Sequence, residues 1–255
     1  MIANYHAHTF RCRHATGTDV EYVLSALEKG LKIFGFSDHT PQFFPGSYYS
    51  YMRMFPEQLE EYCQSVRALR ETFRGHIEIP LGLEVEYYPD IFPNLLPRLR
   101  DAGIEYMILG QHWVGNEENE LYCGSPTEDE TQLRRYCDQA IAAMETGLFT
   151  YLAHPGLLQF VGDRAVYERH MRRLCRTAVQ TTTPVEVNLL GIRSSRHYPT
   201  EAFWEIAGEE GCSAVLGIDA HSPQEIADDT AEPIALALLK KYNIPLLETV
   251  PLKKL

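Results

Sequence analysis

The chain has 255 residues, of which 45% are hydrophobic and 23% are charged, and its formal net charge is −12. This is the balance of an ordinary globular protein, and one domain over residues 1–255 accounts for it. The negative charge argues against a nucleic-acid partner and against an anionic membrane, because both are polyanions that it would repel. A small phosphate ester stays possible, since divalent cations in a pocket would reverse the local field.

The N-terminus and the cysteines predict a cytoplasmic protein. Residues 1–6 contain neither the basic region nor the apolar region of a signal peptide, and the longest fully apolar run covers only residues 234–239. The six cysteines are scattered, with no Cys-x-x-Cys pair, which argues against structural disulfides and against a thiolate zinc knuckle. We expect most of them to be small buried hydrophobic residues.

Apolar, β-branched stretches alternate with amphipathic segments along the chain. Candidate strands cover residues 2–8, 32–37, 77–84, 105–110, 149–153, 184–189 and 213–218. Between them the apolar positions have helical period, as in the stripe from Leu59 to Phe73. Repeated β-α units predict an α/β fold with a parallel sheet, here a (β/α)7 or (β/α)8-like barrel.

Several helix ends can be read directly from the sequence. Capping boxes are predicted at Thr18 with Glu21, at Thr127 with Glu130, and at Ser222-Pro223 with Glu225. Gly30 and Gly147 stand where a left-handed residue would end a helix. Residues 41–55, rich in aromatic residues, proline and glycine, fit neither period, and we expect a long loop there, lying over the functional site.

The positions of the histidines predict that site. In barrels of this kind, catalytic groups gather where the parallel strands end. Seven of the ten histidines lie at or just beyond a predicted strand end, namely His6, His8, His14, His39, His112, His154 and His221, whereas His76, His170 and His197 do not. A single such histidine is more often structural. His6 and His8 are a stronger signal, because residues i and i+2 of a strand point to the same face and can chelate one ion.

Acidic residues accompany the histidines. Glu84 closes an apolar strand, where a charge is unfavourable unless it is paired or bound to metal; the alternatives are a solvated carboxylate at the rim, or Glu86 in the same role. Asp219 and His221 again have i, i+2 spacing, and Asp38 precedes His39. Imidazole and carboxylate ligands without a thiolate suit zinc, manganese or iron(II) and disfavour calcium.

The order of these motifs resembles that of the polymerase and histidinol phosphatase (PHP) family over nearly the whole chain. The motifs are His6-Ala7-His8-Thr9, His14, Ser37-Asp38-His39, Gly82-Leu83-Glu84, His112, Ala153-His154-Pro155 and Gly217-Ile218-Asp219-Ala220-His221. The length, the Cys12-x-His14 pair and the segment 188–198 resemble the monofunctional histidinol-phosphate phosphatases of that family. Gln111-His112-Trp113 departs from the small residue, histidine, aromatic form of the family.

This resemblance implies a distorted (β/α)7 TIM-like barrel with a site for two or three divalent ions, zinc, manganese or iron. Carried onto matching positions, it implies one metal on His6, His8, Glu84 and Asp219, a second on Glu84, His112 and His154, and a third on His14, His39 and His221. Glu84 would then bridge two ions. The implied reaction is hydrolysis of a small phosphomonoester, L-histidinol phosphate.

Catalysis in such a site would start from a metal-bridging hydroxide that attacks the phosphorus atom. The leaving alkoxide needs a proton, which Asp219 or a metal-bound water would supply, and the sequence leaves this choice open. Glu84 and Asp219 are therefore the expected catalytic residues.

Four arginines are candidates for binding the phosphate, because the guanidinium fork matches its oxygens. Arg193 and Arg196 follow the predicted strand 184–189, Arg13 flanks His14, and Arg53 lies in the aromatic loop. An exposed salt bridge is the alternative role for Arg193 and Arg196.

Three other functions remain open on sequence grounds. Amidohydrolases also begin with His-x-His and end with an aspartate, but no lysine ends a middle strand here. A nucleotide phosphatase or exonuclease would share the metal site, although the acidic composition lacks a basic, aromatic-interleaved channel for a polymer. A non-catalytic metal-storage module would not need so many ligands on one face.

Overall fold

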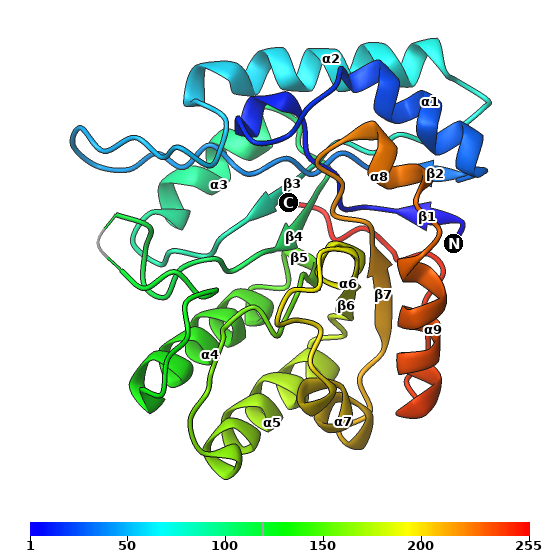
Figure 1. Ribbon diagram of the computed structural model, residues 1–255. Helices are drawn as coiled ribbons and strands as arrows, with labels where there is room; N and C mark the ends of the chain where they lie inside the picture. Colours follow the sequence, from blue (N-terminus) through cyan, green and yellow to red (C-terminus); the bar gives the residue numbers. More distant parts are fainter. Residues whose placement is uncertain (119) are drawn as a thin grey trace.

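The computed structural model describes residues 1–118 and 120–255, with the strands at the centre and helices around them (Figure 1). The strands are β1 Ala3–Asn4, β2 Ile33–Phe34, β3 Gly82–Val85, β4 Tyr106–Leu109, β5 Phe149–Leu152, β6 Val185–Asn188 and β7 Ala214–Gly217. The helices are α1 Asp19–Lys29, α2 Leu59–Thr72, α3 Phe92–Asp101, α4 Glu130–Glu145, α5 Arg164–Gln180, α6 Leu189–Arg193, α7 Glu201–Glu209, α8 Pro223–Ala227 and α9 Ala231–Lys241, with 3-10 turns η1 Phe10–Cys12 and η2 Pro56–Gln58.

All strand pairs in the named sheets are parallel and follow the chain order. One sheet is β1-β2 and the other is β3-β4-β5-β6-β7. Single bridges, Phe36 to Leu81 on one side and Ala7 to Ala220 on the other, connect the edges of the two sheets. The strands therefore surround a common interior without one continuous hydrogen-bonded ladder, which is the distortion expected of this barrel.

The first strand is much shorter than the predicted span 2–8. Beyond Asn4 a side chain replaces the ladder, because the Asn4 amide donates to the carbonyl oxygen of His6 at 3.0 Å and accepts from the backbone N–H of Ile218 at 2.8 Å. This leaves residues 5–8 outside regular pairing except for the bridge at Ala7. The chain is thus anchored beside β7 while its histidines turn into the interior.

Alternation along the strands separates two hydrophobic cores. In β4, Tyr106 and Ile108 belong to a small cluster inside the barrel, whereas Met107 and Leu109 pack outward against the helices. The Tyr106 hydroxyl lies 3.0 Å from the carbonyl oxygens of Tyr5 and Phe36. The interior is therefore filled by a few large side chains at one end, which leaves the other end to polar groups.

The helix ends test the predicted caps. The boxes at Thr18 and Ser222 are present, with Glu21 accepting from the Thr18 N–H at 2.6 Å. Gly30 and Gly147 have φ of 86° and 72°, so their left-handed conformation is also confirmed. The predicted cap at Thr127 is wrong. Its backbone pairs with that of Gln159, and the side chain of Asp129 caps α4 instead, accepting from Thr131 N–H at 2.7 Å.

Other sequence-based expectations concern loops and cysteines. Residues 41–55 contain no helix or strand, as predicted, and Arg13 donates to the carbonyl oxygen of Arg53 at 3.0 Å within this region. All six cysteines are buried and free. None of the described helices is long and apolar enough to cross a membrane.

The close approach of Gly82 in β3 to the ring of Tyr106 leads to a prediction about the stability of the protein. A Cβ at Gly82 would lie 2.2 Å from the Tyr106 ring, so Gly82→Ala should lower the free energy of unfolding by about 1–3 kcal/mol through overpacking. Urea denaturation measures the change. Gly156→Ala is the matched control, because its nearest neighbour would be an ordinary 3.7 Å away. Equal losses in both variants would contradict the packing argument.

Candidate metal centre

Nine candidate ligands converge at the end of the barrel where the strands finish. Glu84 lies in β3, and the others follow strands or the first turn: His6 and His8 after β1, His14 after η1, His39 after β2, His112 after β4, His154 after β5, and Asp219 and His221 after β7. The imidazoles form a continuous series in which the ring centroids of successive members lie 4.1–5.7 Å apart, in the order His14, His221, His8, His39, His112, His154 and His6. The residues that the sequence singled out are therefore brought together.

Glu84 lies at the centre of this series and is fully buried. Its Oε1 is 2.8 Å from His154 Nε2, 3.5 Å from His6 Nε2 and 3.6 Å from His112 Nε2. Its Oε2 is 3.0 Å from His39 Nδ1 and 3.6 Å from His8 Nε2. One carboxylate thus faces five imidazoles, which is the arrangement needed to bridge ions held by different histidines.

Glycine makes room for this carboxylate. A Cβ at Gly110, directly after β4, would lie 1.9 Å from Glu84 Oε1. The glycine is therefore needed for close approach to the acid. It marks a site residue that sequence reasoning missed.

Asp219 forms the second acidic point. Its Oδ1 is 3.0 Å from His8 Nε2 and 3.5 Å from His6 Nε2, and its Oδ2 accepts from Asn188 Nδ2 at 3.0 Å. Asp219 has φ of 51° and His154 has φ of 28°, so both adopt the left-handed backbone that non-glycine residues avoid. Such strain, about 1–3 kcal/mol per residue, is typical of functional sites.

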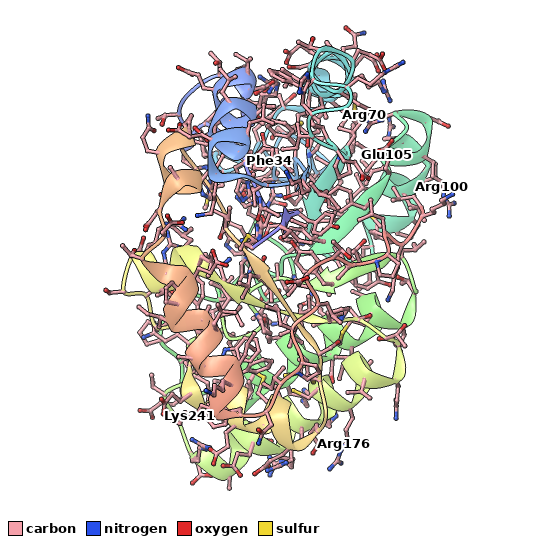
Figure 2. All side chains as sticks on the ribbon, turned by 90° about the vertical axis from the view of Figure 1, so that its right-hand side faces the viewer. Phe34, Arg70, Arg100, Glu105, Arg176 and Lys241 are labelled. Atoms are coloured by element: carbon pink, nitrogen blue, oxygen red, sulfur yellow. The ribbon has the colours of Figure 1, made fainter. Side chains whose placement is uncertain are left out.

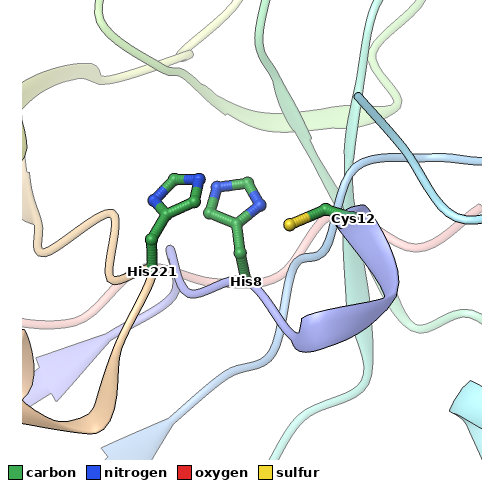
Figure 3. Close-up of side chains that lie close together, drawn as sticks. All are labelled: His8, Cys12 and His221. Atoms are coloured by element: carbon green, nitrogen blue, oxygen red, sulfur yellow. The ribbon is translucent and has the colours of Figure 1, made fainter. Parts of the chain in front are cut away.

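His14, His39 and His221 form a third group of possible ligands. His14 Nδ1 is 2.9 Å from the carbonyl oxygen of Cys12, and His221 Nδ1 is 3.2 Å from that of Asp219. Their Nε2 atoms are therefore the free ones. Figure 3 shows Cys12 beside His8 and His221, and these three side chains also form a possible ligand group. The cysteine is buried as expected, but it borders the site.

The electrostatics of the centre favour bound cations. Burial raises the pKa of Glu84, but His112, His39 and His6 outweigh it and hold this pKa well below its ordinary value, so Glu84 is ionised. Burial lowers the pKa of His8, but Asp219, Asp38 and Glu84 raise it to about 9 overall. In the metal-free protein the acids therefore attract protons onto histidines, and divalent ions would take their place.

Unpaired buried atoms show that the residues fit such ions. Among the described side chains, the buried polar atoms without a hydrogen-bond partner include His6 Nε2, both ring nitrogens of His8, Glu84 Oε2, His154 Nδ1 and Asp219 Oδ1. Each would cost about 1–3 kcal/mol if it stayed unpaired, and they gather in one place. Imidazole nitrogens and carboxylate oxygens are ligands for zinc, manganese and iron.

The other three histidines make different contacts. His76 is exposed beyond the end of α2, His170 Nε2 is 3.1 Å from Glu130 Oε1, and His197 Nε2 is 2.7 Å from the carbonyl oxygen of Leu157. Each thus has a surface or structural environment away from Glu84.

The four candidate arginines differ in what they can still bind. All five N–H groups of Arg53 donate to protein acceptors, on Glu86, Glu117 and Thr40, so none is left for a phosphate. The prediction that Arg53 binds the substrate phosphate is therefore wrong. Its side chain holds Glu86 and Glu117 in place instead. Arg13 donates to carbonyl oxygens of the 41–55 loop.

Arg193 and Arg196 lie after β6 as predicted. Arg193 Nη2 donates to the carbonyl oxygen of Ile218 at 3.0 Å and is 3.8 Å from Glu225. Arg196 is exposed, and one hydrogen bond of its guanidinium is seen among the described residues, to the Tyr198 hydroxyl at 3.0 Å. Burial lowers the pKa of Arg196, but Tyr198 and, less strongly, Asp219 raise it overall.

Sequence reasoning also missed Glu186, a buried acid in β6. Its Oε1 is 2.7 Å from His6 Nδ1. A signal was available, because Glu186 and Asn188 alternate with Val185 and Val187 in an apolar strand and must share the inner face.

Comparisons with known proteins agree with this geometry. The PHP domain family matches residues 4–189. A protein of Deinococcus radiodurans named "Probable histidinol-phosphatase" is 29% identical over 239 residues, which covers 91% of each chain. One of Schizosaccharomyces pombe with the same name is 23% identical, covering 89% of this chain and 82% of its own.

The fold has a close counterpart among solved structures. The crystal structure of histidinol phosphate phosphatase from Lactococcus lactis, complexed with zinc, L-histidinol and phosphate, superposes with a TM-score of 0.72. The sequence identity is 19%, and the match covers 97% of this chain and 96% of that one. With the family match extending over most of the sequence, from before His6 to beyond His154, the chain belongs to the PHP family of hydrolytic enzymes.

Proposed function

We propose that this protein is a metal-dependent phosphomonoesterase that hydrolyses L-histidinol phosphate to L-histidinol and phosphate. The observation that carries the proposal is the set of unpaired buried nitrogen and carboxylate atoms gathered around Glu84, which suits two or three divalent ions. The substrate is supported by relatives named histidinol-phosphatase and by the L-histidinol and phosphate in the related L. lactis structure.

The proposed ligands fall into three sets, of which the first two share Glu84. His6, His8, Glu84 and Asp219 would hold one ion, Glu84, His112 and His154 a second, and His14, His39 and His221 a third. Bound ions supply a water of lowered pKa as nucleophile and neutralise charge on the phosphoryl oxygens. The protein supplies the orientation: three imidazoles face Oε1 of Glu84 and two face its Oε2, and Asn188 Nδ2 donates to Oδ2 of Asp219.

Asp219 is better suited to binding than to donating a proton. Burial raises its pKa, but His6 and His8 outweigh this and keep the pKa well below its ordinary value. A carboxylate held in its ionised form is a good metal ligand and a poor acid. We therefore assign Asp219 to the centre as a ligand.

Arg196 is the arginine that we assign to the substrate phosphate. Its hydrogen-bond partner Tyr198 is buried, with its ring 5.9 Å from that of His154, so the guanidinium lies at the edge of the centre. Arg193 is tied to the carbonyl oxygen of Ile218, the residue before Asp219. We assign Arg193 a weaker contribution, through the placement of Asp219.

The reaction itself is tested by a substrate panel. Metal-replete protein should release phosphate from L-histidinol phosphate more efficiently than from nucleoside monophosphates, and a chelator should abolish turnover until zinc, manganese or iron(II) is restored. Steady-state phosphate release with and without chelator measures this. A preference for the nucleotide would overturn the substrate, and chelator-resistant turnover would overturn the metal dependence.

Removing the charge of Glu84 tests the centre. Glu84→Gln should lose metal and lower kcat/KM on the order of 100-fold or more, because a neutral amide cannot bridge two cations and several kcal/mol of charge stabilisation are lost. Elemental analysis and kinetics give the two readouts. The matched control is Glu105→Gln, an acid at the opposite end of β4 that pairs with Arg70 at 2.6 Å. Wild-type metal content in Glu84→Gln would exclude a bridging role.

The arginine assignment predicts unequal losses. Arg196→Ala should lower kcat/KM about 30- to 1000-fold, corresponding to about 2–4 kcal/mol of transition-state stabilisation, while metal content stays unchanged. Arg193→Ala should cost less, because its side chain already contacts the protein. Steady-state kinetics of both variants on L-histidinol phosphate test this assignment. A near-wild-type kcat/KM for Arg196→Ala would show that Arg196 does not bind the substrate phosphate.

A further inference from the structure

Two buried carboxylates outside the proposed ligand set lie within 3 Å of the Nδ1 atoms of its histidines, whereas a third, Asp38, lies farther away, 3.5 Å from His8 Nδ1. Glu186 Oε1 is 2.7 Å from His6 Nδ1, and Glu86 Oε1 is 2.8 Å from His112 Nδ1. Both acids are almost completely inaccessible to solvent, with exposures of 1% and 0%. In each case the opposite ring nitrogen, Nε2, faces Glu84, at 3.5 Å for His6 and 3.6 Å for His112.

This arrangement determines which ring nitrogen can bind an ion. A neutral imidazole carries one N–H, and a carboxylate accepts that hydrogen at Nδ1. The lone pair is then left on Nε2, toward Glu84, and the negative charge increases the basicity of the ring. His14 Nδ1 lies 2.9 Å from the carbonyl oxygen of Cys12, and His221 Nδ1 lies 3.2 Å from the carbonyl oxygen and 3.5 Å from Oδ1 of Asp219, which is itself a proposed ligand. His6 and His112 are therefore the two proposed ligands whose Nδ1 atoms lie within 3 Å of an outer carboxylate.

Glu186 is held in place by the sheet. Its Oε2 accepts from the backbone N–H of His154 at 2.9 Å and from Asn188 Nδ2 at 3.0 Å. A Cβ at Gly217 would lie 1.8 Å from Glu186 Oε1, so the end of β7 leaves space for this acid. The backbone after β5 and a side chain of β6 thus hold Glu186 beside the end of β7, and through it the ring of His6.

Glu86 is held by a side chain from outside the sheet. Arg53 Nη1 donates to Glu86 Oε2 at 2.7 Å, and Arg53 Nη2 donates to Oε1 at 3.0 Å. The same guanidinium binds Glu117 and the carbonyl oxygen of Thr40. Since Arg53 belongs to the irregular segment 41–55, the orientation of His112 depends on that segment.

We propose that Glu186 and Glu86 are positioning residues for the metal centre, Glu186 for the ion at His6 and Glu86 for the ion at His112. Arg53 completes the second pair and links that ion to the 41–55 loop. The inference rests on the proposed metal-dependent function. It adds that the two halves of the centre are supported independently, one by strands and one by a loop.

Zinc binding tests this division. Zinc affinity is measured by competition with a chromophoric chelator, and bound zinc is counted by elemental analysis, for wild type, Glu186→Gln, Glu86→Gln and Arg53→Lys. Each glutamine variant should bind one zinc ion about 10- to 100-fold more weakly and keep the affinity for the others. Arg53→Lys should weaken the same ion as Glu86→Gln, because lysine keeps the charge but loses the bidentate fork.

The matched control is Glu105→Gln, whose carboxylate pairs with Arg70 at 2.6 Å, before the start of β4; Figure 2 labels both residues. It should bind zinc as wild type does. Circular dichroism and thermal unfolding of the metal-free proteins monitor folding, and if Glu86→Gln fails to fold, Arg53→Lys decides for that half.

Two results would overturn the inference in distinguishable ways. Folded Glu186→Gln and Arg53→Lys proteins with wild-type zinc affinities would show that the outer acids position nothing, while the metal centre stands. Wild-type protein that binds no zinc, manganese or iron would remove the proposed function together with the inference.

Discussion

The burial of one negative charge, that of Glu84, organises this end of the protein. A carboxylate without solvent contact is strongly unfavourable unless cations or hydrogen-bond donors surround it. Here five imidazoles face its two oxygens, and Gly110 gives it room. Their nitrogens cannot all be satisfied by one carboxylate, and several remain without a partner. The proposed divalent ions would relieve both problems, because they would neutralise the acid and accept the nitrogen lone pairs.

The barrel makes this arrangement possible because the carboxyl ends of its parallel strands all lie at the same end. Large side chains such as Tyr106 fill the interior at the other end, and the polar groups follow where the strands finish. Around the central acid lies a series of histidines, and behind two of these lie further acids. His154 and Asp219 have a left-handed backbone, which is unfavourable for residues other than glycine. Such strain is typical of residues whose side chains must occupy a fixed position in a functional site.

A protein with a net charge of −12 can bind an anionic substrate only if positive charge is concentrated at the binding site. The proposed ions would reverse the field inside the pocket. Arg196 is exposed, whereas all the N–H groups of Arg53 donate to Glu86, Glu117 and the carbonyl oxygen of Thr40. Two arginines that look equivalent in the sequence therefore differ in environment: the guanidinium of Arg53 is buried among acceptors, whereas that of Arg196 makes one hydrogen bond among the described residues, to Tyr198.

Local patterns were sufficient to predict several features from the sequence by itself: the seven strand regions, the boxes at Thr18 and Ser222, and the gathering of nine candidate ligands at strand ends. They were sufficient because strand alternation and helix capping depend on residues within a few positions of one another. The true cap at Asp129, the engagement of Arg53 and the Glu186 to His6 contact were decided by the tertiary structure. Glu186 and His6 are 180 positions apart, and only folding chooses which distant partner satisfies a buried polar group.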